Sequence, residues 1–209
     1  MVQSVLPAGA KLLIIGEAPG ADEDRLGKPF IGRSGEMLDQ VLHDVGLDRS
    51  TIAIANAVAC KPPVDIRPLP KFVRACKVWL DMEINDLKPT LIVTLGAVPT
   101  SMALPGAGQI SRLRGHLFDH EQYGCKVLPM FHPAYILRKG GIASSDYGVF
   151  KKDFQLAKDF IEGKYSGPNQ IPGAYGVDRQ FQLKERYIRK KLKQLSRPRV
   201  AQYAVLQCG

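Results

Sequence analysis

The chain has few cysteines and no long apolar run. Its four cysteines, at positions 60, 76, 125 and 208, form no CxxC pair, which argues against a disulfide framework. No apolar stretch approaches the roughly 18 residues that span a bilayer. The first ten residues, MVQSVLPAGA, lack a basic segment followed by an apolar run, so they do not form a secretion signal. We therefore expect a globular, cytoplasmic protein that is not inserted in a membrane.

Acidic residues are scarce at one end of the chain. The whole chain carries 29 Lys or Arg and 20 Asp or Glu, a net charge of +9. Between Arg179 and Arg199, nine basic residues stand against a single acid, Glu185, so this segment holds +8 of that charge. Such a block is typical of a segment that binds nucleic-acid phosphates. The alternative is a solvated helix face or an unstructured tail.

Short apolar runs alternate with amphipathic segments. Runs rich in Val, Ile and Leu read as buried strands at 11–16, 51–59, 90–96 and 126–131. Helical spacing of apolar residues is found at 34–46, 69–87 and 144–163. This order predicts an α/β fold, a three-layer α/β/α sandwich with a central four-stranded parallel sheet.

Composition also divides the chain. We expect a catalytic domain over 1–163, a Pro/Gly-rich linker over 164–178 and a basic C-terminal extension over 179–209. In the extension, apolar residues recur at helical spacing: Leu183, Tyr187, Ile188, Leu192 and Leu195. The extension is therefore predicted to be partly helical.

A long loop follows the first predicted strand. Its sequence, with the end of that strand, is IIGEAPGADEDRLGKPFIGRSG, residues 14–35. Ligands of parallel α/β sheets bind at the carboxyl ends of the strands, where residues 131–141, FHPAYILRKGG, also begin. Two loops distant in sequence are thus predicted to meet over one pocket. GEAPG is not a phosphate loop of the Walker type, because no GK[ST] follows. In GRSGE, Ser34 and the nearby amides either bind an anion or cap the next helix.

Five blocks along the chain make a more specific pattern. GEAPGADEDRLGKPFIGRSGEMLD, NAVACKPP, LIVTLG, LRG and FHPAYILR follow one another from Gly16 to Arg138, within the segment 11–162. In order and spacing they resemble the uracil-DNA glycosylase superfamily, and most closely its family 4. The resemblance implies a DNA repair enzyme of base excision, a monofunctional glycosylase that flips uracil out of DNA and hydrolyses its N-glycosidic bond.

The resemblance implies a pocket for the base. Phe30 would stack on the flipped uracil and Asn56 would read its Watson–Crick edge, beside Gly16 at the end of the first strand. An Asn amide accepts from N3–H and donates to O4, whereas cytosine presents the opposite pattern. A buried mismatch of polar groups would exclude cytosine.

The resemblance also implies catalytic residues. His132 would donate to uracil O2, where negative charge grows as the bond to C1′ breaks. Glu17 would position or activate the attacking water and offset the cationic sugar. Glu23 would lie near uracil C5 and disfavour the thymine methyl group.

Contacts to DNA are implied by the segment after His132. Tyr135, Ile136 and Leu137 would form an apolar wedge in the minor groove, with Arg138 on a phosphate. Ser34 would contact DNA from the first loop. The competing interpretation of YILR is a hydrophobic loop packed on the core.

Cysteine content departs from the family pattern. Family 4 enzymes typically hold a [4Fe-4S] cluster on four cysteines, of which Cys60 and Cys76 match only the second pair. No cysteine stands before the first strand, and two thiolates do not hold a cubane cluster. Cys125 and Cys208 could complete it only if the tail folded back. We expect no cofactor and no metal site, with Cys60 and Cys76 as buried apolar residues.

Three functions remain in competition at this point. The first is the uracil-DNA glycosylase, acting as a monomer on single- or double-stranded DNA, with the basic tail on DNA phosphates or on a replication or repair protein. The second is a non-catalytic DNA-binding member of the superfamily. The third is a related enzyme that acts on another damaged or modified base. The full set of Glu17, Phe30, Asn56 and His132 favours the first.

Overall fold

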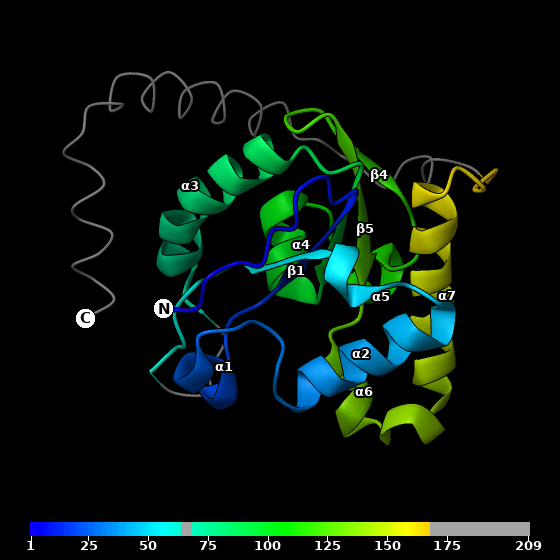
Figure 1. The fold of residues 1–209 in the computed structure, drawn as a ribbon, viewed down its shortest axis with the longest axis horizontal. Coiled ribbons are helices and arrows are strands. Elements are labelled where there is room, and N and C mark those ends of the chain that lie inside the picture. The colour runs from blue at the N-terminus through cyan, green and yellow to red at the C-terminus, as the bar shows by residue number, and fades with distance from the viewer. Residues whose placement is uncertain (64–67, 168–209) are drawn as a thin grey trace. The chain divides into compact units, whose positions relative to one another are not determined.

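A central sheet lies between layers of helices in the computed structural model, which describes residues 1–63 and 68–167 (Figure 1). The strand order is β2-β1-β3-β5-β4. The strands are β1 (Leu12–Gly16), β2 (Ala53–Asn56), β3 (Leu91–Leu95), β4 (Phe118–His120) and β5 (Cys125–Met130). The four that the sequence predicts, β1, β2, β3 and β5, run parallel, so the predicted α/β class is confirmed. The basic extension and the linker beyond residue 167 lie outside the described residues.

The sheet has a fifth strand that the sequence analysis did not predict. β4 pairs antiparallel with β5, with Phe118 opposite Val127. Its three residues, Phe-Asp-His, are too few for an alternating pattern to stand out. The strand forms because the chain turns back directly onto the edge of β5.

The three long predicted helices are present, with ends that shift by at most two residues. The helices are α1 (Ala21–Leu26), α2 (Arg33–Val45), α3 (Pro70–Leu87), α4 (Ala97–Ala103), α5 (Ile110–Leu113), α6 (Pro133–Arg138) and α7 (Ser145–Ile161). Two short 3-10 turns are η1 (Arg49–Thr51) and η2 (Gly141–Ala143). Within the described ranges, no helix combines the length and the apolar character that crossing a bilayer requires.

Each face of the sheet is covered by its own helices. Figure 1 shows α3 and α7 on opposite sides of the strands. Leu12 and Ile14 of β1 belong to the core cluster formed with α2 and α7. In this cluster the rings of Phe150 and Phe154 pack edge to face, with their centroids 5.0 Å apart. The alternate residues, Leu13 and Ile15, are equally buried, on the opposite face of the sheet. Burial on both faces explains why the strands read as continuous apolar runs.

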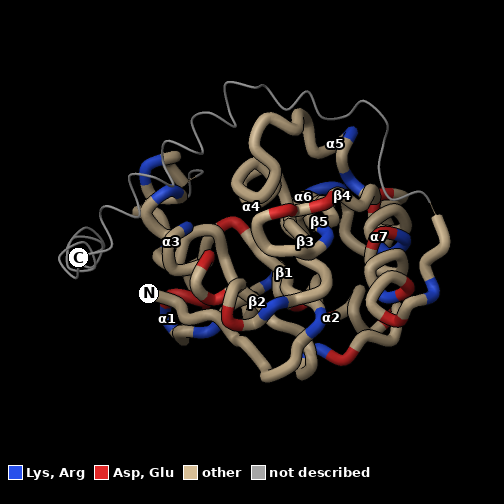
Figure 2. Tube along the Cα trace, turned by 90° about the horizontal axis from the view of Figure 1, so that it is seen from above, with Lys and Arg blue, Asp and Glu red and all other residues tan. Residues whose placement is uncertain are grey.

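Charges of both signs cover the described domain. Figure 2 shows basic and acidic positions interspersed along α7. Some of them join helices: the Tyr147 hydroxyl donates to Asp44 Oδ2 of α2 at 3.1 Å, and Lys151 Nζ donates to the same oxygen at 3.3 Å. Hydrogen bonds from Gln40 and Tyr147 lower the pKa of Asp44. These bonds join α2 to α7, and both helices pack on the same face of the sheet.

Candidate active site

The candidate site lies where the strand order of the sheet reverses. β1 has β2 on one side and β3 on the other, and its last residue, Gly16, pairs in register with Asn56 at the end of β2. His132 follows two residues after the end of β5. The carboxyl ends of three parallel strands therefore bring these residues to one edge, where α/β sheets bind ligands.

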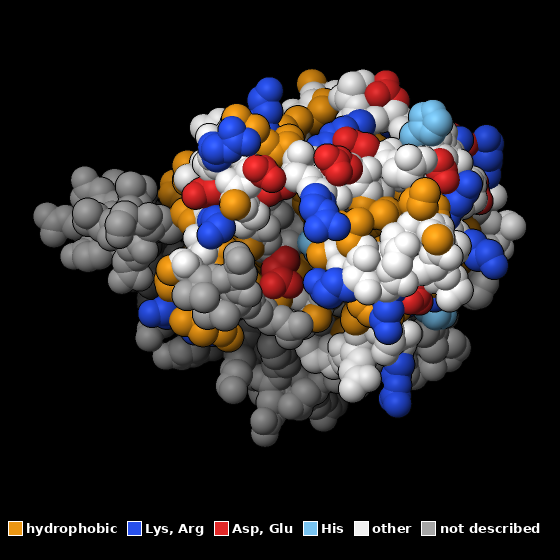
Figure 3. Space-filling model, turned by 90° about the horizontal axis from the view of Figure 1, so that it is seen from below, with side chains coloured by type: hydrophobic (Ala, Val, Ile, Leu, Met, Phe, Trp, Pro, Cys, Tyr) orange, Lys and Arg blue, Asp and Glu red, His pale blue; other side chains and the backbone are white. Residues whose placement is uncertain are grey.

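A cavity of about 320 Å³ opens at this edge. Its volume is at the small end of the range for ligand pockets. It is lined by Ala18, Pro19, Gly20, Ala21, Asp22, Glu23, Phe30, Gly32, Arg33, Ser34, Asn56 and His132. Figure 3 views the molecule from below and shows a hollow with acidic side chains in it and Lys and Arg side chains around it. The loop after β1, α2, β2 and the segment after β5 all contribute, as the sequence predicts.

Gly16 forms part of the base of this arrangement. A Cβ atom at this position would lie 2.5 Å from Asn56 Oδ1 and 2.5 Å from the Phe30 ring. No real Cβ packs so closely, so the position requires glycine. The missing side chain lets the aromatic ring and the amide approach the same point from two sides.

Phe30 adopts an unusual backbone conformation. Its φ is +52°, in the left-handed region, although it is not glycine. Such a conformation costs on the order of 1–3 kcal/mol and persists where the surroundings impose it. The ring is buried, and its centroid lies 6.1 Å from that of His132. Gly35 makes the turn possible, because a Cβ there would lie 2.0 Å from the Phe30 carbonyl oxygen.

Glu23 holds the loop from inside. Its Oε1 accepts hydrogen bonds from the amides of Ile31 at 3.1 Å and Gly32 at 2.9 Å, and its Oε2 accepts from the amide of Gly20 at 3.0 Å. The residue is only 7% exposed and also lines the cavity. The three amides lie before and after α1, so this buried carboxylate holds the two parts of the loop after β1 together. This anchoring was not predicted from the sequence.

His132 has a defined protonation state. It is the N-cap of α6, and its Nδ1 accepts a hydrogen bond from the amide of Ala134 at 3.1 Å. Burial, assisted by the positive charge of Arg138, lowers the pKa of His132 to about 4. The ring is therefore neutral at physiological pH, and because Nδ1 is an acceptor, its proton resides on Nε2. Nε2 is the atom that can donate to a ligand.

An ion pair behind the site was not predicted. The Arg114 guanidinium binds the Asp153 carboxylate in a bidentate manner, with Nε at 2.7 Å from Oδ2. Asp153, on α7, is 2% exposed. The same guanidinium lies 5.8 Å from the centroid of the Phe131 ring, next to His132. The LRG block in the sequence includes Arg114, but its partner is 39 residues away.

Glu17 stands apart from the cavity walls. It directly follows β1 and is half-buried, and its carbonyl oxygen accepts from the Val58 amide at 3.2 Å. The residues that line the cavity in the described structure do not include it. Its predicted role with water therefore stays a prediction.

The segment after His132 is helical, and one predicted DNA contact is wrong. Residues 133–138 form α6, in which Ile136 is fully buried in the core cluster. A side chain in the core cannot also enter a DNA groove, so Ile136 is not part of a wedge. Tyr135 and Leu137 are half-buried and pack against the core, while Arg138 is exposed.

The start of α2 also differs from the prediction. The N-cap is Gly32, and the helix begins at Arg33, so Ser34 does not cap it. Ser34 lies in the first turn and lines the cavity, as Arg33 and Asp22 do. Arg33 and Asp22 were not predicted as site residues. Arg33 directly follows a glycine at the start of a predicted helix, and this position could have indicated that it lies at the pocket.

Most of the chain matches the model of a known family. The family model described as the uracil DNA glycosylase superfamily matches residues 3–155. The chain belongs to this superfamily. The resemblance found in the sequence is therefore confirmed.

Three curated relatives in this superfamily are named type-4 uracil-DNA glycosylases. The protein from Thermotoga maritima is 36% identical over 153 residues, which cover 73% of this chain and 78% of the relative. That from Saccharolobus solfataricus is 34% identical over 162 residues, 74% of this chain and 73% of the relative. That from Archaeoglobus fulgidus is 33% identical over 153 residues, 70% and 77% of the two chains.

The described residues do not fit an iron-sulfur cluster. Over 1–63 and 68–167, no three His, Cys, Asp or Glu side chains are grouped so that they could hold a metal ion. Cys60 and Cys76 are partly exposed and not buried as predicted. Cys125 is buried on β5, and burial raises the pKa of its thiol to about 11. Cys208 lies outside the described residues.

Proposed function

We propose that this member of the superfamily is a monofunctional uracil-DNA glycosylase. It removes uracil from DNA by hydrolysing the N-glycosidic bond and leaves an abasic site for base excision repair. The observation that carries the proposal is the meeting of Phe30, Asn56 and His132 at one cavity of about 320 Å³. An aromatic face, an amide and a neutral ring donor are the groups that recognise and activate a flipped pyrimidine.

Recognition of uracil follows from the cavity walls. Phe30 stacks on the base, and the Asn56 amide accepts from N3–H and donates to O4. Gly16 leaves the room that both groups need. Glu23, whose oxygens are held by three amides, lies on the wall that faces C5 and disfavours a methyl group there. Cytosine is rejected because its donor and acceptor pattern is reversed, which leaves buried polar groups unpaired.

Bond cleavage relies on His132 Nε2–H. As the bond to C1′ lengthens, negative charge moves to uracil O2, and a fixed neutral donor at that oxygen stabilises the transition state more than the ground state. The low pKa of His132, about 4, means that it acts as a hydrogen-bond donor and not as an acid. Glu17, at the end of β1, positions the attacking water and offsets the positive charge on the sugar.

Contacts with the DNA strand come from both loops. Ser34, in the first turn of α2, binds a phosphate together with the nearby amides. Arg138 is exposed and binds a second phosphate. Tyr135 and Leu137 face the space that the flipped base vacates. The basic extension, 179–209, adds affinity for DNA phosphates or binds a replication or repair protein.

We further propose that the catalytic domain, 1–163, works as a monomer in the cytoplasm and without an iron-sulfur cluster. Protein contacts join the segments that a cluster would join. The Val2 amide donates to the Ala59 carbonyl oxygen at 2.7 Å, and the Ser4 hydroxyl donates to Glu83 of α3 at 2.8 Å. These bonds hold the N-terminal segment against the loop after β2 and against α3. Iron analysis and a visible spectrum of anaerobically purified protein test this: iron at four atoms per chain would contradict it.

Cleavage of a defined oligonucleotide tests the activity. The substrate is end-labelled, carries one uracil and is treated with alkali after incubation; matched strands carry thymine or hypoxanthine. We expect scission at uracil alone, and its loss in the His132→Ala and Asn56→Ala variants. Intact uracil DNA together with tight, salt-sensitive binding would instead favour the non-catalytic DNA-binding function. Scission at hypoxanthine would favour an enzyme that acts on another damaged base.

A further inference from the structure

The backbone at Phe30 is held in a conformation that an aromatic residue does not favour. With a φ of +52°, Phe30 is one of two non-glycine residues with positive φ among those described. The same residue supplies the aromatic wall of the cavity. The groups that hold this backbone therefore also set the position of the ring on which a base stacks.

Arg49 holds the carbonyl groups of this turn. Its Nη2 donates to the carbonyl oxygen of Phe30 at 2.9 Å and to that of Pro29 at 3.2 Å. Its Nη1 binds the carboxylate of Asp39, on α2. One planar guanidinium thus joins the turn to the helix that follows it.

The amides beyond Phe30 are held by the opposite charge. Glu23 accepts from the two following amides, at 3.1 and 2.9 Å. A cation on the carbonyl side and an anion on the amide side therefore clamp the turn from both directions. Charge-assisted hydrogen bonds of this kind are stronger than bonds between neutral groups.

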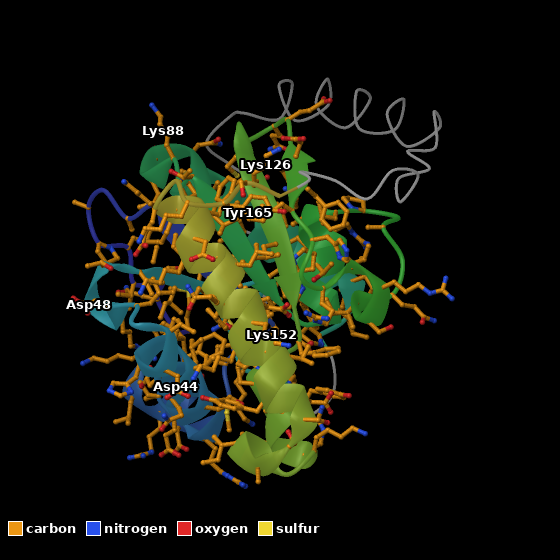
Figure 4. All side chains as sticks on the ribbon, turned by 90° about the vertical axis from the view of Figure 1, so that its right-hand side faces the viewer. Asp44, Asp48, Lys88, Lys126, Lys152 and Tyr165 are labelled. Atoms are coloured by element: carbon orange, nitrogen blue, oxygen red, sulfur yellow. The ribbon has the colours of Figure 1, made fainter. Side chains whose placement is uncertain are left out.

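Arg49 also lies on the segment that leads to Asn56. It opens η1, whose N-cap is Asp48, labelled in Figure 4, with a side chain that accepts from the Ser50 amide at 2.9 Å. β2 begins shortly afterwards, at Ala53, and ends at Asn56. The segment that presents the amide to the base thus also fixes the aromatic ring opposite it.

We propose that Arg49 is a positioning residue for base recognition, which holds the turn at Phe30 so that the ring stacks on the flipped base. The inference rests on the proposed glycosylase function. Arg49 does not line the cavity, so it acts through Phe30. Arginine suits the task because its rigid fork serves two carbonyl groups and a carboxylate at once, whereas the lysine ammonium is a point charge on a flexible stem.

Four variants separate this role from simple stabilisation. Arg49→Met removes every donor and keeps an apolar stem, and Arg49→Lys keeps only the charge. Asp39→Asn removes the ion pair but leaves both carbonyl contacts. Lys151→Met is the matched control, because it removes the ion pair between Lys151 Nζ and Asp44 Oδ2, which are 3.3 Å apart. Asp44 is labelled in Figure 4 and lies where α2 and α7 run side by side.

The measurements are KM, the single-turnover rate and the inhibition constant of free uracil. Thermal unfolding gives the fraction of folded protein in each sample. For Arg49→Met we expect a KM and a uracil inhibition constant raised at least about tenfold, and a rate per folded molecule lowered about 10- to 100-fold, as for a displaced binding group. Arg49→Lys should recover part of this loss. Asp39→Asn and Lys151→Met should stay within about threefold, as exposed ion pairs contribute little.

Several results would overturn the inference. The first is that native protein and Arg49→Met cleave uracil DNA equally well and are inhibited equally by free uracil. Another is a loss that disappears when rates are expressed per folded molecule. An Asp39→Asn loss as large as that of Arg49→Met would show that the ion pair, and not the carbonyl contacts, matters. A native protein that leaves uracil DNA intact would overturn the proposed function first and this inference with it.

Discussion

The protonation state of His132 gives a sharp test of the catalytic mechanism. Its pKa in the folded protein is about 4, below the value of about 6.5 for an unperturbed histidine. At pH 5 a ring with the lowered pKa is about nine-tenths neutral, whereas an unperturbed ring is about 3% neutral. If the neutral ring is the donor to uracil, the native enzyme keeps most of its single-turnover rate from pH 7.5 down to pH 5.

The same pKa also affects stability. Because the folded pKa lies below the unfolded one, the contribution is fully present above about pH 6.5 and is lost as the pH falls towards 4. The two pKa values give a loss of about 2 kcal/mol between pH 8 and pH 5. His132→Gln, which cannot titrate, should lack this part of the pH dependence in the free energy of unfolding.

The assay combines two measurements on native protein and His132→Gln. Single-turnover cleavage with saturating enzyme is measured from pH 5 to pH 8, and urea unfolding is followed by circular dichroism over the same range. A native rate that halves near pH 6.5 would refute the reasoning. So would a pH dependence of unfolding that is the same in both proteins.

Other residues give further expectations. Gly16→Ala should lower cleavage at least about 100-fold, because the new Cβ would lie 2.5 Å from both the aromatic ring and the amide of the pocket. Gly148→Ala, where nothing lies within 4 Å of the new Cβ, is the control and should stabilise α7 by about 0.5–1 kcal/mol. Asp153→Asn breaks a buried bidentate pair and should lower the free energy of unfolding by about 3–5 kcal/mol in urea titrations; a loss below about 1 kcal/mol would contradict this assignment. Arg138→Gln removes a positive charge that lowers the pKa of His132, so that pKa, followed by NMR, should rise, and the salt dependence of DNA binding should weaken by about one phosphate contact.

Local sequence was sufficient for the framework of the fold. The parallel strands appear as continuous apolar runs because both of their faces are buried, and the long helices show apolar spacing of three and four residues. β4 escaped because a three-residue strand has too few positions to show a period. α6 was read as a loop because its six residues begin with proline and contain little more than one turn.

The order and spacing of the motifs were sufficient to nominate the pocket. Gly16, Phe30, Asn56 and His132 were expected together, and the structure brings them to one edge of the sheet. Ile136 was misplaced because the sequence does not show which side of a short helix faces the core. A helix cap was one of the two roles considered for Ser34, but the helix begins at the preceding residue, with Gly32 as its N-cap.

The sequence by itself determined which residues are present, how the strands and long helices alternate, and to which family the chain belongs. Only the tertiary structure decided how the site residues are held. Arg49 lies 19 residues from Phe30, and Asp153 lies 39 residues from Arg114. The low pKa of His132 likewise depends on burial among side chains that are distant in sequence. Such contacts depend on directions and distances in three dimensions, which no local pattern of residues encodes.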